Sequence, residues 1–330
     1  MAAMNIRAAG ILAAGSGLRR GAASLCVSLA LLPFPAIAQV PGDIAAMREH
    51  ALALVNESRE AEGLNALTLG EDAVEAAQAH ADDMFDRDYY AHESPEGETV
   101  QDRYIDAGGS PWHLAAENIA RCVGCPPPSE TTVGNLHQGW MDSPGHRANI
   151  LAPGLATFGF GLTSGAEEGL YAVQTFAGPG VPRGLAPDEE PVALAPAEQA
   201  ERALNYVNRA REREGAAALQ PAEALSAAAA NLLPPPDQEE FTLNAGGDLF
   251  AALPEGERTA WASLMVLAGV CGGCGTEPTS ADIRDFVRGW LGDPGYRATL
   301  LDREVTHLGF ALLPDGDGRK IAVLVLGQAR

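Results

Sequence analysis

Lysine is almost absent from this sequence, and basic residues are scarce altogether. Lys320 is the one lysine, and lysine and arginine together number 22 against 44 aspartates and glutamates, a formal net charge of −22. A surface with this excess of carboxylates repels phosphate groups. We therefore expect no nucleic acid partner.

Long apolar stretches are also lacking, with one exception near the start. The run from Ala22 to Phe34 has about a dozen residues before its proline, too few to span a bilayer. Three arginines precede this run, and an Ala-Ile-Ala sequence at 36–38 follows it. This pattern is typical of a cleaved secretory signal peptide over residues 1–38, with a membrane anchor as the alternative. We expect a secreted or periplasmic protein with no transmembrane segment after cleavage.

The linear signatures of common hydrolases are missing as well. The sequence contains no H-E-x-x-H and no G-x-S-x-G motif. The two glycines of GFGLTS, residues 159–164, stand in a strand pattern and do not indicate a phosphate-binding loop.

What the sequence does contain is an internal repeat. VNESREAEG at 55–63 returns as VNRAREREG at 207–215. GWMDSPGHRANIL at 139–151 returns as GWLGDPGYRATLL at 289–301. CVGC at 122–125 returns as CGGC at 271–274. The motifs keep their order and are offset by 149 to 152 residues, so a whole domain is duplicated.

The repeat divides the chain into domains. Residues 183–196 are rich in proline and acid without apolar periodicity, which is typical of a linker. We predict a first domain over residues 40–182 and a second over residues 197–330.

Apolar spacing predicts the elements of the first copy. Apolar residues at three- and four-residue steps predict four helices. The first covers Asp43–Glu62, the second passes through Ala77, and the third starts near Val100. The fourth contains Trp140 and ends at a Ser-Pro-Gly turn. Alternation predicts two strands, at 156–163 and 171–177, and the second copy repeats this ending. Helices on both faces of a small sheet follow from this pattern.

Five motifs in this order resemble the bacterial branch of the CAP superfamily, named after cysteine-rich secretory proteins, antigen 5 and pathogenesis-related proteins, whose domain is also called SCP. They are LVNESREAEGLNALTL, AHESPEGETVQDRY, AAENIA, GWMDSPGHRANIL and the strand pair FGFGL and YAVQTFA. The resemblance covers about residues 45–180 and, in degraded form, 197–330. It implies an α/β fold, a three-layer α-β-α sandwich around a small antiparallel sheet, present twice.

The resemblance also implies a cleft lined by two histidines and two acidic residues, which binds a divalent metal in several members. The first histidine maps to His92 and the first glutamate to Glu117. The second acid falls on Ser143, where this chain departs from the pattern, and His146 is the candidate for the second imidazole. Together His92, Glu117 and His146 are candidate ligands of a zinc-like divalent ion.

A polar cluster without metal is the competing interpretation of the same residues. In that case His146 caps the turn and His92 bonds to the backbone, and the network stabilises the fold. Asn118 and Asn149 are expected to bond to backbone groups. Three histidines on helices outside any motif are predicted to lie at the surface: His50, His80 and His137.

The cysteines that follow the signal form two C-x-x-C pairs at equivalent places in the repeat. In an exported chain we expect one short-range disulfide in each copy, Cys122–Cys125 and Cys271–Cys274. A redox-active pair and a zinc site shared by all four cysteines are the alternatives.

The second copy has lost the candidate site. Its residues at the positions of Glu117, Asn118 and His146 are Val266, Leu267 and Tyr296, and a proline-rich segment replaces the one that carries His92. Trp290 and Arg297 are kept, so we assign the shared residues to the fold and the lost ones to a site.

These observations favour an exported binding or envelope-associated module rather than an enzyme. Its cleft lies in the first domain, and its partner is an unidentified envelope or extracellular ligand. The alternatives are a metal-dependent hydrolase that uses the same cleft, and a lipid or sterol binder, for which the sequence offers no distinct apolar loop.

Overall fold

Each copy folds into helices packed on a four-stranded sheet. A computed structural model describes residues 40–165, 169–186, 188–235, 243 and 248–330. The first copy contains α1 (Ile44–Ala61), β1 (Thr68–Leu69), α2 (Glu71–Asp86), α3 (Val100–Asp106), β2 (Leu114–Cys122), α4 (Glu130–Asp142), α5 (Pro144–Ile150), β3 (Thr157–Gly165) and β4 (Gly169–Gly178). The second contains α6 (Pro196–Arg213), β5 (Gln220–Pro221), α7 (Glu223–Leu232), β6 (Trp261–Cys271), α8 (Ser280–Gly292), α9 (Pro294–Leu300), β7 (His307–Pro314) and β8 (Lys320–Ala329), with two 3-10 turns, η1 (Leu249–Ala252) and η2 (Glu257–Ala260), before β6.

The two sheets have the same topology. Their strand orders are β1-β3-β4-β2 and β5-β7-β8-β6. The long strands pair antiparallel, and the two-residue strands β1 and β5 add a short parallel edge to β3 and β7. The predicted α-β-α fold, present twice, is confirmed.

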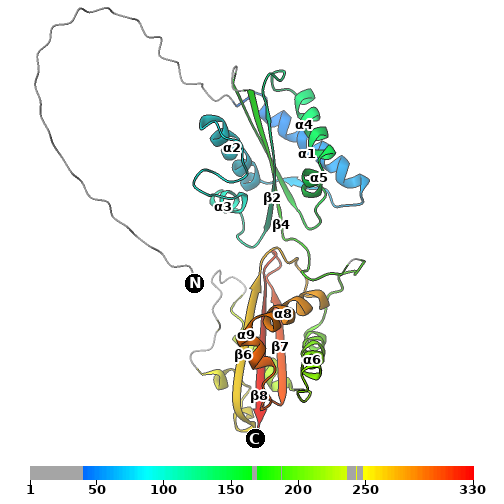
Figure 1. Cartoon of the computed structure of the whole chain (residues 1–330), viewed down its shortest axis with the longest axis vertical. Coiled ribbons are helices and arrows are strands. Elements are labelled where there is room, and N and C mark those ends of the chain that lie inside the picture. The colour runs from blue at the N-terminus through cyan, green and yellow to red at the C-terminus, as the bar shows by residue number, and fades with distance from the viewer. Residues whose placement is uncertain (1–39, 166–168, 187, 236–242, 244–247) are drawn as a thin grey trace, which may run out of the picture. The chain divides into compact units, whose positions relative to one another are not determined.

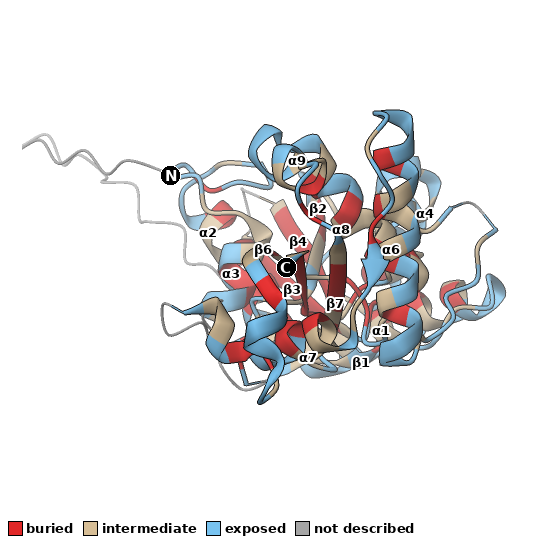
Figure 2. Ribbon diagram, turned by 90° about the horizontal axis from the view of Figure 1, so that it is seen from below, coloured by how far each residue is buried: buried red, intermediate tan, exposed pale blue. Residues whose placement is uncertain are grey.

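Helices cover both faces of the first sheet, and apolar side chains fill the two interfaces. In Figure 1, α2 and α3 lie on one side of β2 and β4, while α1, α4 and α5 lie on the other. Met47 of α1 and Trp140 of α4 pack with Phe160 of β3 in one core cluster. Met84 of α2 packs with Tyr171 of β4 in the other. Figure 2 shows buried residues along the strands and exposed residues on the outer sides of the helices.

Two glycines explain features of the sequence motifs. Gly63, which ends the α1 motif, has a φ of +71°, a left-handed conformation that glycine adopts without strain. Gly159 of β3 faces the backbone of α2, where an added Cβ would clash with the carbonyl of Ala73. The alternating glycines of the GFG motif therefore let α2 approach the sheet closely.

A short helix begins within the predicted Ser-Pro-Gly turn. The Ser-Pro-Gly sequence was predicted to end α4 and lead directly towards the strands, but α5 begins at Pro144, with Ser143 as the residue before it. Proline is favoured at the first position of a helix because its φ is fixed near the helical value and its missing N–H needs no partner there. The fourth helix therefore ends where it was predicted to end, and the helix over residues 144–150 was missed.

A buried arginine holds the same junction in both copies. Arg59 of α1 donates from Nη1 to the carbonyls of Ile150 and Ala152, at 2.8 and 2.9 Å. Arg211 of α6 donates from Nη1 to the carbonyls of Leu300, at the end of α9, and Asp302, at 2.8 Å each. Both arginines are at most 1% exposed. This residue of the repeated V-N-x-x-R motif therefore ties the first helix of each copy to the segment after the short helix.

A buried ion pair distinguishes the second copy. Lys320 Nζ lies 2.7 Å from Asp282 Oδ2, and both side chains are fully buried. Thr279 donates to the same carboxylate from its backbone N–H and its hydroxyl. Burial lowers the pKa of the Lys320 ammonium, and the hydrogen bond to Asp282 opposes this shift. The first copy has Leu170 at the position of Lys320.

The described residues, from Val40 to Arg330, belong to one compact unit. Among the residues that the structure describes, no helix combines the length and the apolar character needed to cross a membrane. The predicted signal peptide, residues 1–38, lies outside the described residues.

Candidate functional site

Glu117 is the centre of the candidate site. It lies in the middle of β2, opposite Thr175 of β4, and its side chain is 2% exposed. A carboxylate this deeply buried needs compensating partners. Three elements supply them: the segment after α2 carries His92, α3 carries Arg103, and α2 carries His80.

The geometry around Glu117 is close and directional. His92 Nδ1 lies 2.8 Å from Oε1, and Arg103 Nη2 lies 2.9 Å from Oε2. Because a carboxylate only accepts hydrogen bonds, Nδ1 of His92 carries the proton in this contact. When the ring is neutral, its Nε2 then carries the free lone pair. His80 Nε2 lies 3.7 Å from Oε1 and 3.0 Å from the Ala91 carbonyl.

Burial differs sharply within this cluster. The side chains of His80 and Arg103 are 1% and 5% exposed, whereas that of His92 is 56% exposed. Arg103 Nη2 also donates to the His92 carbonyl at 2.9 Å, which fixes the backbone that carries the exposed imidazole. His92 is thus the solvent-facing end of an otherwise buried network.

The pKa values of the histidines in this cluster shift in opposite directions. The hydrogen bond that His92 donates to Glu117 raises the pKa of His92 above its ordinary value, against the effect of desolvation. Desolvation lowers the pKa of His80, although the nearby Glu117 charge acts the other way. Desolvation, followed by repulsion from His92, lowers the pKa of His146. The exposed ring is therefore the one that most readily carries a proton.

The backbone of His146, in α5, is tied to β2 through a set of amides. Asn118 Nδ2 donates to the His146 carbonyl at 3.2 Å, and Asn149 Nδ2 donates to the Glu117 carbonyl at 2.9 Å. Asn149 Nδ2 also lies 3.0 Å from Asn118 Oδ1. The predicted backbone hydrogen bonds of both asparagines are confirmed. They fix α5 against β2, next to Glu117.

Two of the surface assignments are wrong. His80 and His137 are 1% and 7% exposed, and both are buried on the inner faces of their helices. His137 Nε2 lies 2.9 Å from Ser58 Oγ of α1. His50 is half-buried. Ser143, the residue that replaces the second acid, stands between α4 and α5 and makes no capping hydrogen bond through its side chain.

The metal site predicted at His92, Glu117 and His146 stays a prediction, and two features of the structure bear on it. One Glu117 oxygen accepts from His92 and the other from Arg103, whose positive charge opposes a second cation. Over the described part of the chain, no group of three or more His, Cys, Asp or Glu side chains is placed to hold a metal ion. Glu117 instead orients His92, as an outer carboxylate orients an imidazole ligand or base.

The second copy has an apolar residue at the position of Glu117, and two tryptophans fix the comparison. Trp140 Nε1 donates to the Ile119 carbonyl at 3.1 Å, and Trp290 Nε1 donates to the Ala268 carbonyl at 3.3 Å. Since Ile119 corresponds to Ala268, counting back two residues places Val266 at the position of Glu117. The shared tryptophan supports the fold in both copies.

Both C-x-x-C pairs form local disulfides. The Cα atoms are 5.8 Å apart in Cys122–Cys125 and 6.2 Å apart in Cys271–Cys274, within the range that a disulfide bridges. Each bond closes the turn that follows the strand bearing the Glu117 position. The expected pairing within each copy is confirmed.

Comparison with known proteins identifies the family of this chain. The model of the cysteine-rich secretory protein family, CAP, matches residues 52–176 and again residues 204–326. The chain belongs to this family. Both copies are CAP domains, as the resemblance of the motifs implied.

Three similar proteins come from bacteria. The uncharacterized protein YkwD of Bacillus subtilis is 33% identical over 138 residues, which are 42% of this chain and 49% of that protein, so the chain spans about half the length of this relative. An extracellular protein of Bacillus anthracis with an SCP domain is 27% identical, with a TM-score of 0.34, over 42% of this chain and 44% of that one. An outer surface protein of Borrelia burgdorferi is 15% identical, with a TM-score of 0.36, over 43% of this chain and 98% of that one.

Proposed function

We propose that this CAP protein is exported and that its first domain binds an envelope or extracellular ligand at His92. The ligand group that suits this site is a hydrogen-bond acceptor or a carboxylate, because the raised pKa of His92 favours a ring that donates. The observation that supports the proposal most is the exposed imidazole above a buried Glu117–Arg103 pair.

A purely structural network has no need of such an exposed end. Burying two charges is costly, and the pair here orients a side chain that is 56% exposed. Tyr90 adds to the argument: it is 47% exposed, and its hydroxyl donates to the Ile119 carbonyl, two residues from Glu117. An exposed ring that is fixed at one end is a common ligand contact. Tyr90 and His92 together give the site an aromatic wall and a polar donor.

Hydrolysis at this site is the second candidate, and one observation favours it. A carboxylate on Nδ1 with Nε2 left free is the arrangement of base and orienting acid in serine hydrolases. The nearby Ser94 does not complete it, because its hydroxyl donates to Glu96. A metal-dependent version would rely on His92 and His146 as ligands, since Glu117 is occupied. Binding therefore has the stronger support.

Export is tested by the N-terminus of the protein isolated from outside the cytoplasm. Cleavage after Ala38 predicts a first peptide that begins at Gln39. A protein that keeps residues 1–38 and stays in the cytoplasm would contradict the export part of the proposal.

Binding at His92 is tested by NMR on residues 36–330 with labelled histidines. We expect sodium acetate to shift the His92 ring signals and leave those of His307, in the second domain, unchanged. Glu117→Gln should abolish the response, because it removes the group that holds and charges the ring. Zinc chloride is the second probe, and simultaneous changes at His92 and His146 would support two-histidine metal binding. If neither probe affects His92, the cluster serves the fold alone.

A further inference from the structure

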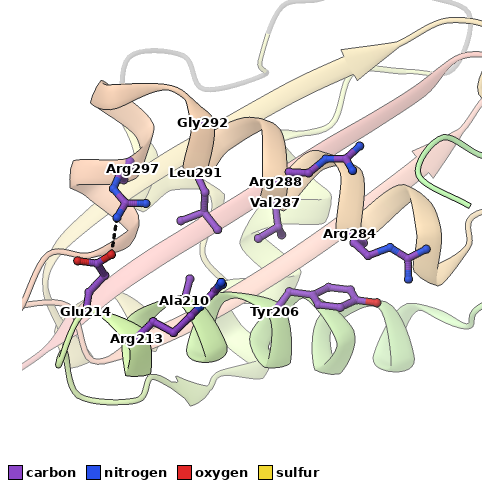
Figure 3. A pocket seen from close by; sticks show the side chains of 10 residues that line it. All are labelled: Tyr206, Ala210, Arg213, Glu214, Arg284, Val287, Arg288, Leu291, Gly292 and Arg297. Atoms are coloured by element: carbon purple, nitrogen blue, oxygen red, sulfur yellow. Dashed lines mark hydrogen bonds and ion pairs between the residues drawn. The ribbon is translucent and has the colours of Figure 1, made fainter. Parts of the chain in front are cut away.

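The second domain has a groove that is rich in arginine. It lies between α6 and the pair α8 and α9, and its volume is about 530 Å³. Four of its lining residues are arginines: Arg213, Arg284, Arg288 and Arg297. Figure 3 shows Arg213 on α6 opposite Val287 and Leu291 of α8, with Arg284 towards one end and the Arg297–Glu214 pair at the other. Nearly a fifth of the 22 basic residues of an acidic chain thus line one groove.

The first domain has the same groove with the opposite charge. That groove lies between α1 and the pair α4 and α5, and its volume is about 450 Å³. One arginine lines it, Arg147, together with three acids, Glu57, Glu62 and Asp142. The lining charge is therefore −2 in the first domain and +3 in the second, where Glu214 is the one acid.

A comparison of equivalent positions shows which arginines the second groove has and the first groove lacks. The arginine motifs of α1 and α6 align Arg59 with Arg211, so Ala61 corresponds to Arg213. The tryptophans of α4 and α8 align Gln138 with Arg288 in the same way. By contrast, one ion pair is kept, because Arg147–Glu62 at 2.7 Å matches Arg297–Glu214 at 2.6 Å. The kept pair belongs to the fold, and the added arginines are specific to the second domain.

The added arginines are available to a ligand. Arg213 donates from Nε to the Arg209 carbonyl, and it forms no ion pair with any residue that the structure describes. Arg288 pairs with Asp285 on its own helix, but its side chain is 69% exposed. Arg284 pairs with Glu189 of the linker. The Arg288–Asp285 pair contributes little free energy because its arginine is exposed, so an anion that binds several arginines at once can displace it. Arg284 is about one-third exposed and also donates to the Gly184 carbonyl, so it is less available than Arg213 and Arg288.

We propose that this groove binds a compact anion with two or more phosphate or carboxylate groups. The planar guanidinium group donates two parallel hydrogen bonds to either group, and several arginines together require more than one negative charge. Val287 is buried and Leu291 half-buried between them, which adds an apolar floor. The formal charge of −22 repels extended anionic surfaces, so a small ligand that enters the groove fits better than a polymer or a membrane.

The test uses calorimetric titration of residues 36–330 with pyrophosphate and with citrate at low ionic strength. We expect binding to at least one of the two probes, and the pair distinguishes phosphate from carboxylate recognition. Arg213→Ala and Arg288→Gln introduce the residues that the first domain carries at these positions, so both variants should fold. The double variant should weaken binding by at least about tenfold, or 1.4 kcal/mol, and so should added salt.

Glu57→Gln in the first groove is the matched control and should leave the affinity unchanged. Three outcomes would overturn the proposal: no binding of either probe, binding that the double variant leaves intact, or equal weakening by the control. Vesicles rich in phosphatidylglycerol distinguish a lipid headgroup from a free phosphate. Tight vesicle binding that depends on the arginines would assign the groove to a membrane surface and refute the compact ligand. The outcome is independent of His92, which belongs to the other domain.

Discussion

Replacing Glu117 by glutamine should destabilise the first domain by about 3 kcal/mol. The change keeps the size of the side chain but removes the charge that Arg103 and His92 share. Arg103 is 5% exposed and would retain two carbonyl acceptors, Glu98 and His92, at 3.0 and 2.9 Å. Losing one partner of a buried pair costs about 3 to 5 kcal/mol, and the remaining acceptors favour the lower end.

The loss of stability caused by Glu117→Gln should be larger at low pH than at high pH. Because the folded pKa of His92 is raised, its pair with Glu117 contributes stability that is fully present below the unfolded pKa. That contribution is lost as the pH rises through the folded value. Glu117→Gln should therefore cost more at about pH 5.5 than at about pH 8.5, and the variant should lower the pKa of His92.

Urea unfolding at both pH values and an NMR titration of His92 measure these effects. Glu96→Gln is the control, since this carboxylate pairs with Arg87 at the surface, with side chains 68% and 38% exposed. It should change stability by less than about 0.5 kcal/mol. A loss below about 1 kcal/mol for Glu117→Gln, or an unchanged His92 pKa, would refute the idea of a desolvated pair that charges the exposed ring.

Three further changes test other parts of the first domain. Burial lowers the pKa of His137, so the free energy of unfolding should fall as the pH drops below the pKa of this histidine in the unfolded chain. His137→Val, which introduces the residue of the second copy, should reduce this fall in urea unfolding. An unchanged dependence of stability on pH would contradict the expectation. Asn149→Ala should cost about 1 to 3 kcal/mol in thermal unfolding because the Glu117 carbonyl and the Asn118 amide oxygen lose the donor that Asn149 supplies; a neutral effect would show that water replaces this donor. Replacing both Cys122 and Cys125 by alanine should cost about 2 kcal/mol, because the closed loop is short, and a variant that no longer folds would disprove this estimate.

Sequence patterns predicted the elements that carry strong periodicity and the pairing of His92 with Glu117. The motif order placed both residues in one family cleft, and they lie in hydrogen-bond contact. Arg103 was missed for a physical reason. Arginines are rarely buried, and nothing in the QDRY sequence distinguishes this one from a surface residue.

The buried histidines, in contrast, had a signal in the sequence. His137 stands four residues after Val133 and three before Trp140, which places all three on one face of α4. His80 stands three residues after Ala77 and four before Met84, which likewise places all three on one face of α2. Periodicity alone therefore predicted both inner faces, and assigning these residues to the surface by their polarity was the error. The burial of a polar residue follows from its place in the pattern when a partner is available.

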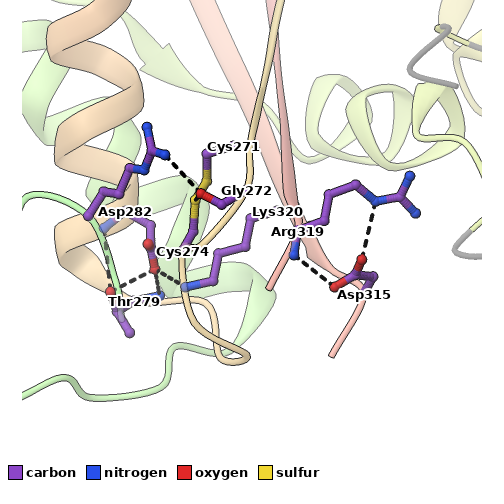
Figure 4. Close-up of a disulfide and its surroundings, with 9 residues drawn as sticks. Cys271, Gly272, Cys274, Thr279, Asp282, Asp315, Arg319 and Lys320 are labelled. Atoms are coloured by element: carbon purple, nitrogen blue, oxygen red, sulfur yellow. Dashed lines mark hydrogen bonds and ion pairs between the residues drawn. A yellow bond between two sulfur atoms is a disulfide. The ribbon is translucent and has the colours of Figure 1, made fainter. Parts of the chain in front are cut away.

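Lys320 gives the second domain a built-in reporter of opening. It is the one lysine of the sequence, and Figure 4 shows its ammonium group directed at Asp282 beneath the Cys271–Cys274 turn. With a fully buried side chain, it is closed to reagents that acylate amines while the domain is folded. Acylation at Lys320 therefore requires the domain to open, and its rate at increasing urea concentrations reports the population of the open form. Amine-directed cross-linkers, for the same reason, are poor tools for finding the partners of this protein, and reagents that couple to its abundant carboxylates are the better choice.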